Sequence, residues 1–330
     1  MSKRDVLRHF GLNRLGHYNG ATFKKAVSEV VDAIRDNEML AIVGDPGVGK
    51  STVFREAVRE LTFNPDTAPT FIYVNDWFRE RMTIANIMNA ILEDLKVDNI
   101  RHCMEARSRQ TVKALGEATG VHYSRRSGRI EQTRQVSVVI EQGHRLHLNT
   151  LIALKELREA TFAGRDRLCS VILLGHQDMK TKMMKRDEIA LRTEFLMLDE
   201  DHGWMTLDER VRYIEAVYGK AVTPEARKRI ALRKRTPLEI QHYLQTKMRS
   251  DMLAGYDVID KDAVEETIQE KYEALGVSYN AIANEAKMSK TTVSNVFKGK
   301  AEHLVPDVMK ALENLEVKQI TKTIKQAEAV

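Results

Sequence analysis

The segment Gly44–Ser51 combines residue types and spacing that could hold a phosphate group. Its sequence, GDPGVGKS, fits the phosphate-loop pattern G-x-x-x-x-G-K-[ST]. Apolar residues 39–43 precede it and residues 52–58 follow with helical spacing, which is the strand–loop–helix context that the motif needs. The glycines let backbone N–H groups close around an anion, and the helix N-terminus adds its positive dipole end. A chance glycine-rich turn is the alternative, and the context argues against it.

This loop predicts that the chain binds a nucleoside triphosphate, which we take to be ATP, together with Mg²⁺. Lys50 would reach the β- and γ-phosphates, and the Ser51 hydroxyl would take one Mg²⁺ coordination position. The expected contacts come from consecutive residues, namely Gly44, Asp45, Pro46, Gly47, Val48, Gly49, Lys50, Ser51 and Thr52.

Polar residues that could complete the site follow a later apolar run, Val136–Ile140. A phosphate-loop ATPase needs an acidic residue for the metal shell and a second carboxylate that orients the attacking water. Glu141 and Gln142 stand in those positions. The segment resembles the Asp-Glu-Ala-His/Gln segment of AAA+ ATPases, with Glu141 in place of the metal-side aspartate and Gln142 in place of the catalytic glutamate.

Gln142 has a chemical consequence. An amide can hydrogen-bond to a water molecule but cannot accept its proton, so we expect nucleotide binding with slow hydrolysis. Gln142 is either a natural feature of a switch that relies on bound ATP or an engineered substitution. In an alternative register, Glu141 is the base and Ile140 takes the metal position, which would leave the metal poorly held.

The AAA+ resemblance implies two further roles. His176, with Gln177 as an alternative, lies at the tip of the fourth apolar run, where these ATPases sense the γ-phosphate. Arg192, before the fifth run, stands where an arginine acts on the ATP of a neighbouring subunit; a surface ion pair is the alternative. The lid arginine of many members has no clear match, because Leu238 occupies its place and Arg235 is only a weak substitute.

Five short apolar runs alternate with helical patterns. The runs predict strands at 39–43, 70–75, 136–140, 170–174 and 194–198. Such alternation predicts an α/β fold with a parallel sheet covered on both faces. From about Thr206 the pattern is helical, with a capping box at 206–209 and prolines at helix starts. We expect a P-loop NTPase of AAA+ layout, divided into a lead (1–21), an α/β domain (22–205), a helical lid (206–258), a C-terminal all-α domain (259–317) and a tail (318–330).

Composition describes an ordinary globular chain of 330 residues, with 43% hydrophobic and 30% charged residues. No apolar run approaches the ~20 residues that span a bilayer, and the first residues lack a signal-peptide core, so we expect a cytoplasmic protein without a membrane partner. Two cysteines support neither a disulfide framework nor a zinc cluster. The net charge of +5 is compatible with nucleic acid without indicating it.

Basic residues gather in two places of the α/β region. Between 101 and 129, arginines and a lysine far outnumber carboxylates, and residues 123–129 look like a loop with bare guanidinium groups. A solvated face is the alternative interpretation. A second segment, residues 77–81, follows the second run, although its aromatic residues could face the core. The candidate DNA-backbone contacts are Arg79, Arg81, Arg125, Arg126 and Arg129.

The C-terminal region, residues 278–300, resembles a phage-repressor-type helix-turn-helix. Ile282, Ala283, Val293 and Phe297 have core spacing, and Ser289 is placed to cap the second helix. Flanking helices are expected near 262–275 and 304–315. The second helix would lie in the major groove, although a protein-binding helical bundle is the alternative. The expected DNA contacts are Lys290, Thr291, Thr292, Ser294, Asn295 and Lys298.

An AAA+ module joined to such a helix-turn-helix resembles the AAA+ regulators of DNA transposition, the group that includes the phage Mu B protein, although there the helix-turn-helix lies at the other end. The resemblance implies ATP-dependent assembly on duplex DNA, as a hexameric ring or helical filament, and recruitment or stimulation of a transposase. The opening residues also resemble the ExeA-type ATPases. A secretion-associated ATPase and an ATP-gated transcription regulator are therefore the alternatives.

Overall fold

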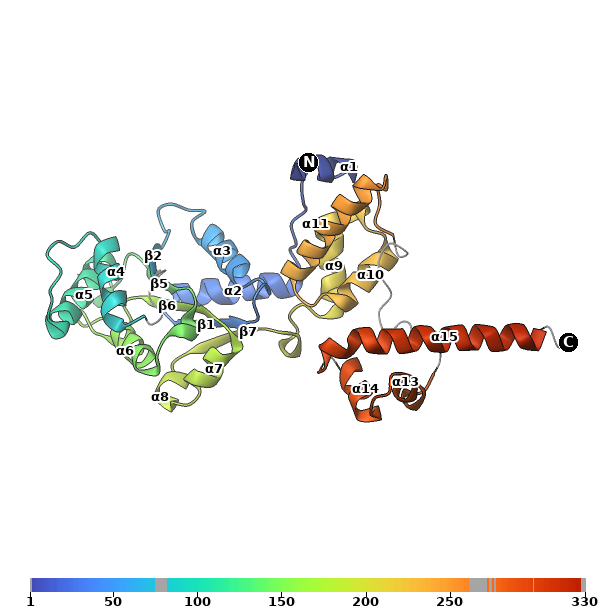
Figure 1. The fold of residues 1–330 in the computed structure, drawn as a ribbon. Helices are drawn as coiled ribbons and strands as arrows, with labels where there is room; N and C mark the ends of the chain where they lie inside the picture. Colours follow the sequence, from blue (N-terminus) through green and yellow to red (C-terminus); the bar gives the residue numbers. More distant parts are fainter. Residues whose placement is uncertain are drawn as a thin grey trace. The chain divides into compact units, whose positions relative to one another are not determined.

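The computed structural model describes residues 2–74, 82–260, 272, 275, 277–298 and 300–327. The chain divides into two compact units (Figure 1). The sheet unit comprises residues 16–217 and 235–245, and the helical unit comprises residues 1–15, 218–234 and 246–330. The division into lead, α/β domain, lid, C-terminal domain and tail stays a prediction.

The sheet unit is built on one parallel sheet. Its strands are β1 (Met39–Gly44), β2 (Thr70–Val74), β5 (Val136–Ile140), β6 (Ser170–Gly175) and β7 (Glu194–Leu198), in the order β2-β5-β6-β1-β7. β1, β5 and β6 are buried along their whole lengths, as expected for strands covered on both faces. The predicted α/β fold with a parallel sheet is confirmed, and each strand of this sheet coincides with a predicted apolar run.

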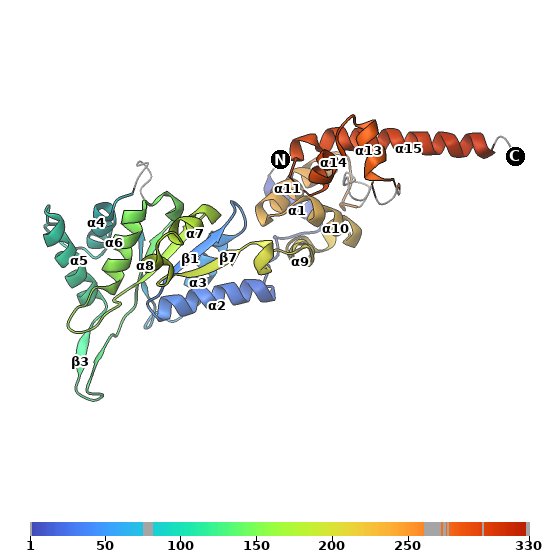
Figure 2. The same cartoon turned by 90° about the horizontal axis from the view of Figure 1, so that it is seen from below.

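Helices cover both faces of this sheet (Figure 2). α2 (Ala21–Arg35) and α3 (Lys50–Leu61) lie on one face. α4 (Ile84–Asp94), α6 (Leu148–Glu159) and α7 (Gln177–Met183) lie on the other. α2 buries the stripe of residues spaced three and four apart that its sequence predicts, because that stripe packs against α3 and β6.

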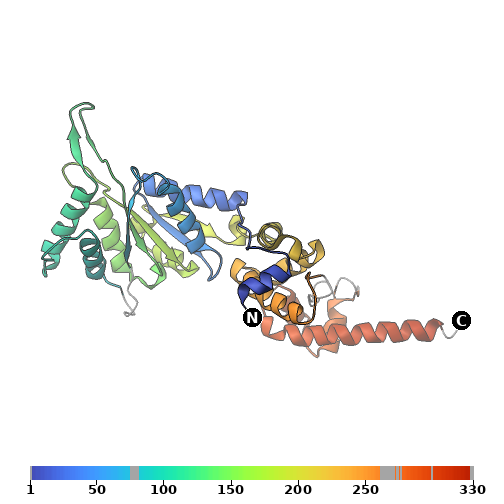
Figure 3. The ribbon, with the colours of Figure 1, turned by 90° about the horizontal axis from the view of Figure 1, so that it is seen from above.

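The arginine-rich stretch is more ordered than the predicted loop. α5 (Met104–Ala118) leads into β3 (His122–Ser124), which pairs with β4 (Arg129–Glu131) in an antiparallel hairpin. Gly128 adopts φ +66° in the turn, a conformation that glycine reaches without strain. The prediction of a plain loop at residues 123–129 is wrong at its two ends and holds only for the turn. Figures 2 and 3 show this hairpin projecting from the sheet.

After β7, the helix α9 (Leu207–Tyr218) is hydrogen-bonded to residues that precede β1, namely Tyr18 and Thr22. Glu209 lies in the first turn of α9, and its carboxylate accepts a hydrogen bond from the Met205 N–H at 2.8 Å and also from the hydroxyls of Tyr18 and Thr22. The predicted capping box at 206–209 therefore forms only in part. Thr206 Oγ1 does accept the Glu209 N–H, at 3.4 Å, but the glutamate serves neighbouring groups instead of the Thr206 N–H.

The helical unit contains the remaining helices. They are α1 (Lys3–His9), α10 (Pro224–Arg233), the end of α11 (Pro237–Leu253), α13 (Tyr279–Glu285), α14 (Lys290–Phe297) and α15 (Val305–Ala327). α13 and α14 are separated by residues 286–289, and Ser289 Oγ accepts the Thr292 N–H at 3.0 Å as a cap. Ile282, Val293 and Leu312 form their shared core with α15. Most of the helix predicted near 262–275 lies outside the described residues.

No helix within the described ranges is both long and apolar enough to cross a membrane.

Candidate nucleotide site

The phosphate loop connects β1 to α3 at the carboxyl edge of the sheet. Gly47 and Gly49 adopt φ angles of +79° and +112°, which side-chain-bearing residues rarely reach. The Lys50 ammonium donates to the carbonyl oxygens of Gly44 and Asp45, each at 2.8 Å. Burial lowers the pKa of Lys50, and the nearby Asp45 carboxylate opposes that shift. The nine predicted contact residues, 44–52, thus form a loop and helix start with the backbone shape an anion site needs.

Two residues that sequence reasoning did not assign hold this loop in place. Trp204 is 4% exposed, and its indole N–H donates to the Val48 carbonyl at 3.0 Å. The Leu238 N–H, at the start of α11, donates to the Gly47 carbonyl at 3.3 Å. A methyl group added at Gly47 would lie 2.6 Å from the Leu238 Cβ. Leu238, which occupies the place expected for a lid arginine, therefore contacts the phosphate loop through its backbone N–H, and its side chain lies beside Gly47.

The acidic segment follows β5, two strands from β1 in the sheet order. Glu141 and Gln142 are both exposed at the carboxyl edge, where the phosphate loop also lies. Gln142 has φ 60° and ψ 38°, a left-handed conformation that is uncommon for glutamine and that often marks a functional position. Burial, and then the Glu141 carboxylate, raise the pKa of Tyr73 on the neighbouring strand β2.

His176 lies directly after β6 and is the cap residue of α7. Its ring packs edge-on against the ring of His144, with the ring centroids 4.3 Å apart. Lys182 on α7 donates to the carbonyl oxygens of His144 and Leu146, at 2.6 and 3.1 Å. Burial, and then His176, lower the pKa of His144. The segment after Gln142 and the tip of β6 are thereby joined, a contact that the sequence did not predict.

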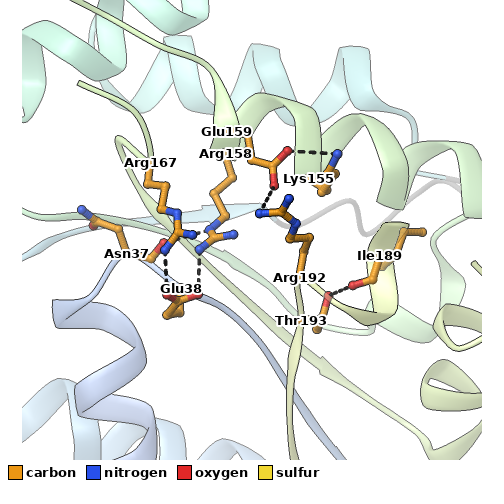
Figure 4. Close-up of polar contacts among 9 residues, drawn as sticks. All are labelled: Asn37, Glu38, Lys155, Arg158, Glu159, Arg167, Ile189, Arg192 and Thr193. Atoms are coloured by element: carbon orange, nitrogen blue, oxygen red, sulfur yellow. Dashed lines mark hydrogen bonds and ion pairs between the residues drawn. The ribbon is translucent and has the colours of Figure 1, made fainter. Parts of the chain in front are cut away.

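Arg192 follows α8 (Asp187–Ala190) and precedes β7. Its side chain is 52% exposed and lies 3.6 Å from the Glu159 carboxylate, which also binds Lys155 at 2.9 Å (Figure 4). Thr193 anchors the segment, because its hydroxyl donates to the Ile189 carbonyl at 2.9 Å. Within this chain, Arg192 takes part in a surface ion pair. Its action on a neighbouring subunit stays a prediction.

The residues assigned to Mg²⁺ fit that ion chemically. Ser51 supplies a hydroxyl and Glu141 a carboxylate, and both side chains are exposed. Mg²⁺ prefers oxygen ligands and keeps several waters, so one or two protein oxygens plus phosphate suffice. No group of three or more His, Cys, Asp or Glu side chains in the described part of the chain could hold a metal by itself.

The predicted DNA contacts fall on separate elements. Arg125, Arg126 and Arg129 are exposed on the hairpin turn and the first residue of β4. Arg79 and Arg81 lie outside the described residues. The third group is on and just after α14, where Lys290, Thr291 and Lys298 are exposed and Thr292, Ser294 and Asn295 are partly exposed. The structure does not bring the hairpin and α14 into one unit.

A family model matches part of this chain, and solved structures resemble its fold. Residues 34–183 match the family model described as an AAA domain. The structure resembles Cdc6p from Pyrobaculum aerophilum, with 14% identity, 94% of this chain and 89% of that chain covered, and a TM-score of 0.51. It also resembles ORC2 from Aeropyrum pernix, with 11% identity, 95% of this chain and 98% of that chain covered, and a TM-score of 0.49. A RuvB variant from Thermotoga maritima shows 15% identity, with 86% of this chain and 87% of that chain covered, and a TM-score of 0.45.

No curated protein matches the sequence significantly. The family model covers the phosphate loop, the segment after β5 and the tip of β6, which are the parts that carry the predicted nucleotide contacts. Residues 34–183 are therefore similar to an AAA domain, and the chain has a P-loop fold of AAA+ type.

Proposed function

We propose that this chain is an ATP-dependent DNA-binding protein that assembles on duplex DNA and regulates a transposase. The observation that carries the proposal is the joining, in one chain, of a complete phosphate loop within an AAA domain to the α13–α14 pair, whose second helix presents polar and basic residues. The first part would bind ATP, and the second would contact DNA.

At the nucleotide site, each residue has a distinct task. The backbone N–H groups of the phosphate loop and the Lys50 ammonium bind and orient the phosphates. Ser51 and Glu141 would hold Mg²⁺, which supplies charge neutralisation at the phosphates when bound. Gln142 can orient a water by hydrogen bonding but cannot accept its proton, so hydrolysis is slow and the ATP state persists.

Nucleotide state would be linked to assembly through Arg192. Its guanidinium is half exposed, and the Glu159 carboxylate, at 3.6 Å, is its one ion-pair partner among the residues that the structure describes. An exposed pair of this kind contributes little stability, so exchange for a phosphate of a neighbouring subunit costs little. ATP between two copies would then favour a ring or filament.

DNA binding would use two kinds of contact. The exposed guanidinium groups of Arg125, Arg126 and Arg129 suit backbone phosphates, which requires no particular sequence. Lys290, Asn295 and their neighbours on α14 suit a major groove. An assembly that marks DNA in this way could recruit or stimulate a transposase.

Negative-stain imaging of the full chain with ATP, Mg²⁺ and random-sequence duplex DNA tests this proposal. We expect rings or filaments on the DNA only when nucleotide is present, and none with Lys50→Ala. Binding to a single operator regardless of nucleotide would favour a transcription regulator. Absence of DNA binding under every nucleotide condition would contradict the proposal and favour a secretion-associated ATPase.

A further inference from the structure

A cavity of about 530 Å³ opens at the amino edge of the sheet, away from the phosphate loop. Its walls include the end of α2, the segment after α3 and residues 132–135, which lead from the hairpin into β5. Those residues precede strands, whereas the phosphate loop follows one, so the two sites lie at opposite ends of parallel strands. A strand of six residues is about 20 Å long, so no single ligand of nucleotide size could touch both sites.

The charge of this cavity favours an anion. Three guanidinium groups line it, those of Arg35, Arg134 and Arg165, against one carboxylate, that of Glu60. Other arginines nearby are paired, since Arg158 and Arg167 bind Glu38 at 2.7 and 3.1 Å (Figure 4). Among the described residues, no carboxylate lies within ion-pair distance of the three cavity arginines. Guanidinium groups without a carboxylate partner are well suited to phosphate oxygens.

The cavity also contains an aromatic ring that could stack. Phe63 lines it and is 91% exposed, the highest exposure among the large apolar side chains that the structure describes. An aromatic ring beside arginines is the combination on which nucleic-acid-binding proteins stack bases. The volume falls within the range of about 300–1,000 Å³ that small-molecule sites occupy. A nucleoside phosphate combines the two features that these walls would recognise, an anion and a flat ring.

The walls are fixed by hydrogen bonds that link distant segments. Gln135 donates to the Arg35 carbonyl at 2.8 Å, and Gln132 donates to the Arg134 carbonyl at 2.7 Å and accepts from the Asn37 amide at 3.2 Å. These bonds hold the end of α2 against the start of β5. The cavity is therefore formed in advance, which lowers the entropy cost of binding.

Two polar atoms of the cavity-lining residues lack partners among the described residues. Asn37 is 5% exposed, and its Oδ1 is buried without a hydrogen-bond donor. The Nε of Arg165 is likewise buried without an acceptor. Unsatisfied buried polar atoms are rare and costly, and both belong to residues of the cavity wall, although neither atom is itself exposed.

We propose that this amino-edge cavity is a second nucleotide-binding site, distinct from the phosphate loop. Its arginines hold the phosphate and Phe63 stacks on the base. The ligand is a nucleoside phosphate, either free or as one unit of a nucleic-acid strand that continues along the hairpin, since residue 132 directly follows β4. This site does not depend on the function proposed above.

Calorimetric titration of the full-length Lys50→Ala variant tests the proposal, because that change disables the phosphate loop. The probes are AMP, inorganic phosphate and a five-nucleotide thymidine strand. We expect one AMP to bind per chain. Its affinity should be at least about tenfold higher than that of inorganic phosphate, because AMP has a base that can stack on Phe63 and inorganic phosphate has none. Tighter binding of the strand than of AMP would identify the strand as the source of the ligand, and the reverse order would identify the free nucleotide.

Matched variants locate the binding. Arg134→Gln and Phe63→Ala alter exposed side chains of the cavity, and each should weaken AMP binding by about tenfold. Arg186→Gln and Leu253→Ala alter exposed side chains elsewhere and should leave it unchanged. With Lys50 intact, the cavity variants should keep ATP affinity at the phosphate loop, which separates failure here from failure of the proposed function. Absence of AMP and strand binding in Lys50→Ala, or binding insensitive to both cavity variants, would overturn the proposal.

Discussion

The buried arginine cluster at the amino edge of the sheet and the phosphate loop at its carboxyl edge differ in how their charged groups are partnered. At the amino edge, the buried Arg158 donates to the Asn37 carbonyl at 2.8 Å and pairs with Glu38, which also binds Arg167. At the carboxyl edge, the charged groups have fewer side-chain partners. Within the described part of the chain, the Lys50 ammonium donates to two backbone carbonyls and to no side chain, and Glu141 and Gln142 are exposed.

This difference distinguishes a structural ion pair from charged groups that remain available to a ligand. An arginine that is 1% exposed must be paired, because an unpaired buried charge is strongly destabilising. A lysine or glutamate that binds phosphate or Mg²⁺, as proposed for Lys50 and Glu141, would have to keep its charge available for the ligand. Substitutions at the amino-edge cluster should therefore change folding, and those at the carboxyl edge should change nucleotide chemistry.

The largest effect should come from Arg158→Ala. Removing this guanidinium leaves the Asn37 carbonyl and part of Glu38 without a donor in a buried place, so the free energy of unfolding should fall by about 3 kcal/mol or more. Chemical denaturation measures the loss. Arg192→Ala is the matched control, since its exposed pair with Glu159 should contribute less than about 1 kcal/mol. Equal losses for the two variants would contradict the contrast between buried and exposed arginines.

Gln142→Glu should act on turnover and not on folding. A carboxylate at this position can accept the proton of the attacking water, and general-base catalysis contributes about 100-fold or more. Steady-state ATP hydrolysis with duplex DNA present is the measurement, with Gln142→Ala as the control that adds no base. An unchanged rate for Gln142→Glu would mean that the assumed register, with Glu141 at the metal and Gln142 at the water, is wrong.

Gly47→Ala should weaken nucleotide binding by about tenfold or more, because it combines a strained φ of +79° with a clash against Leu238. Gly203→Ala is the control. Gly203 has the same φ of +79°, but a methyl group there would meet nothing within 4 Å. The difference between the two variants separates an effect within the phosphate loop from the same backbone strain outside it. Adding Leu238→Ala to Gly47→Ala should restore part of the affinity by removing the clash, and no recovery would contradict a role for the Leu238 contact.

The smallest effect should be a pH dependence of stability at His144. Burial and His176 lower its pKa from the usual 6.5, so the folded chain favours the neutral ring. The stability from this preference is complete above pH 6.5 and is lost as the pH falls through the lowered pKa. Thermal unfolding from pH 7.5 to 5 should therefore show a shallower acid loss for His144→Ala than for His102→Ala, an exposed control. Identical profiles would exclude this role.

The sequence predicted the sheet and the phosphate loop well because both depend on local patterns. Short apolar runs identify buried parallel strands, and glycine spacing identifies the loop. Trp204 and Leu238 were missed as loop contacts because the Trp204–Val48 bond joins residues 156 positions apart, which no local pattern reveals. The Arg158–Glu38 pair, 120 positions apart, was missed for the same reason. The hairpin was missed because strands of three mostly exposed residues lack an apolar signal.

We propose above all that nucleotide bound at residues 44–51 controls the affinity of the protein for double-stranded DNA. Fluorescence anisotropy of a labelled random-sequence duplex, titrated with wild-type and Lys50→Ala protein with and without ATP, tests it most directly. The account predicts that ATP tightens wild-type binding at least about tenfold and leaves Lys50→Ala at the nucleotide-free level. Equal DNA affinity for both proteins, with or without ATP, would contradict it.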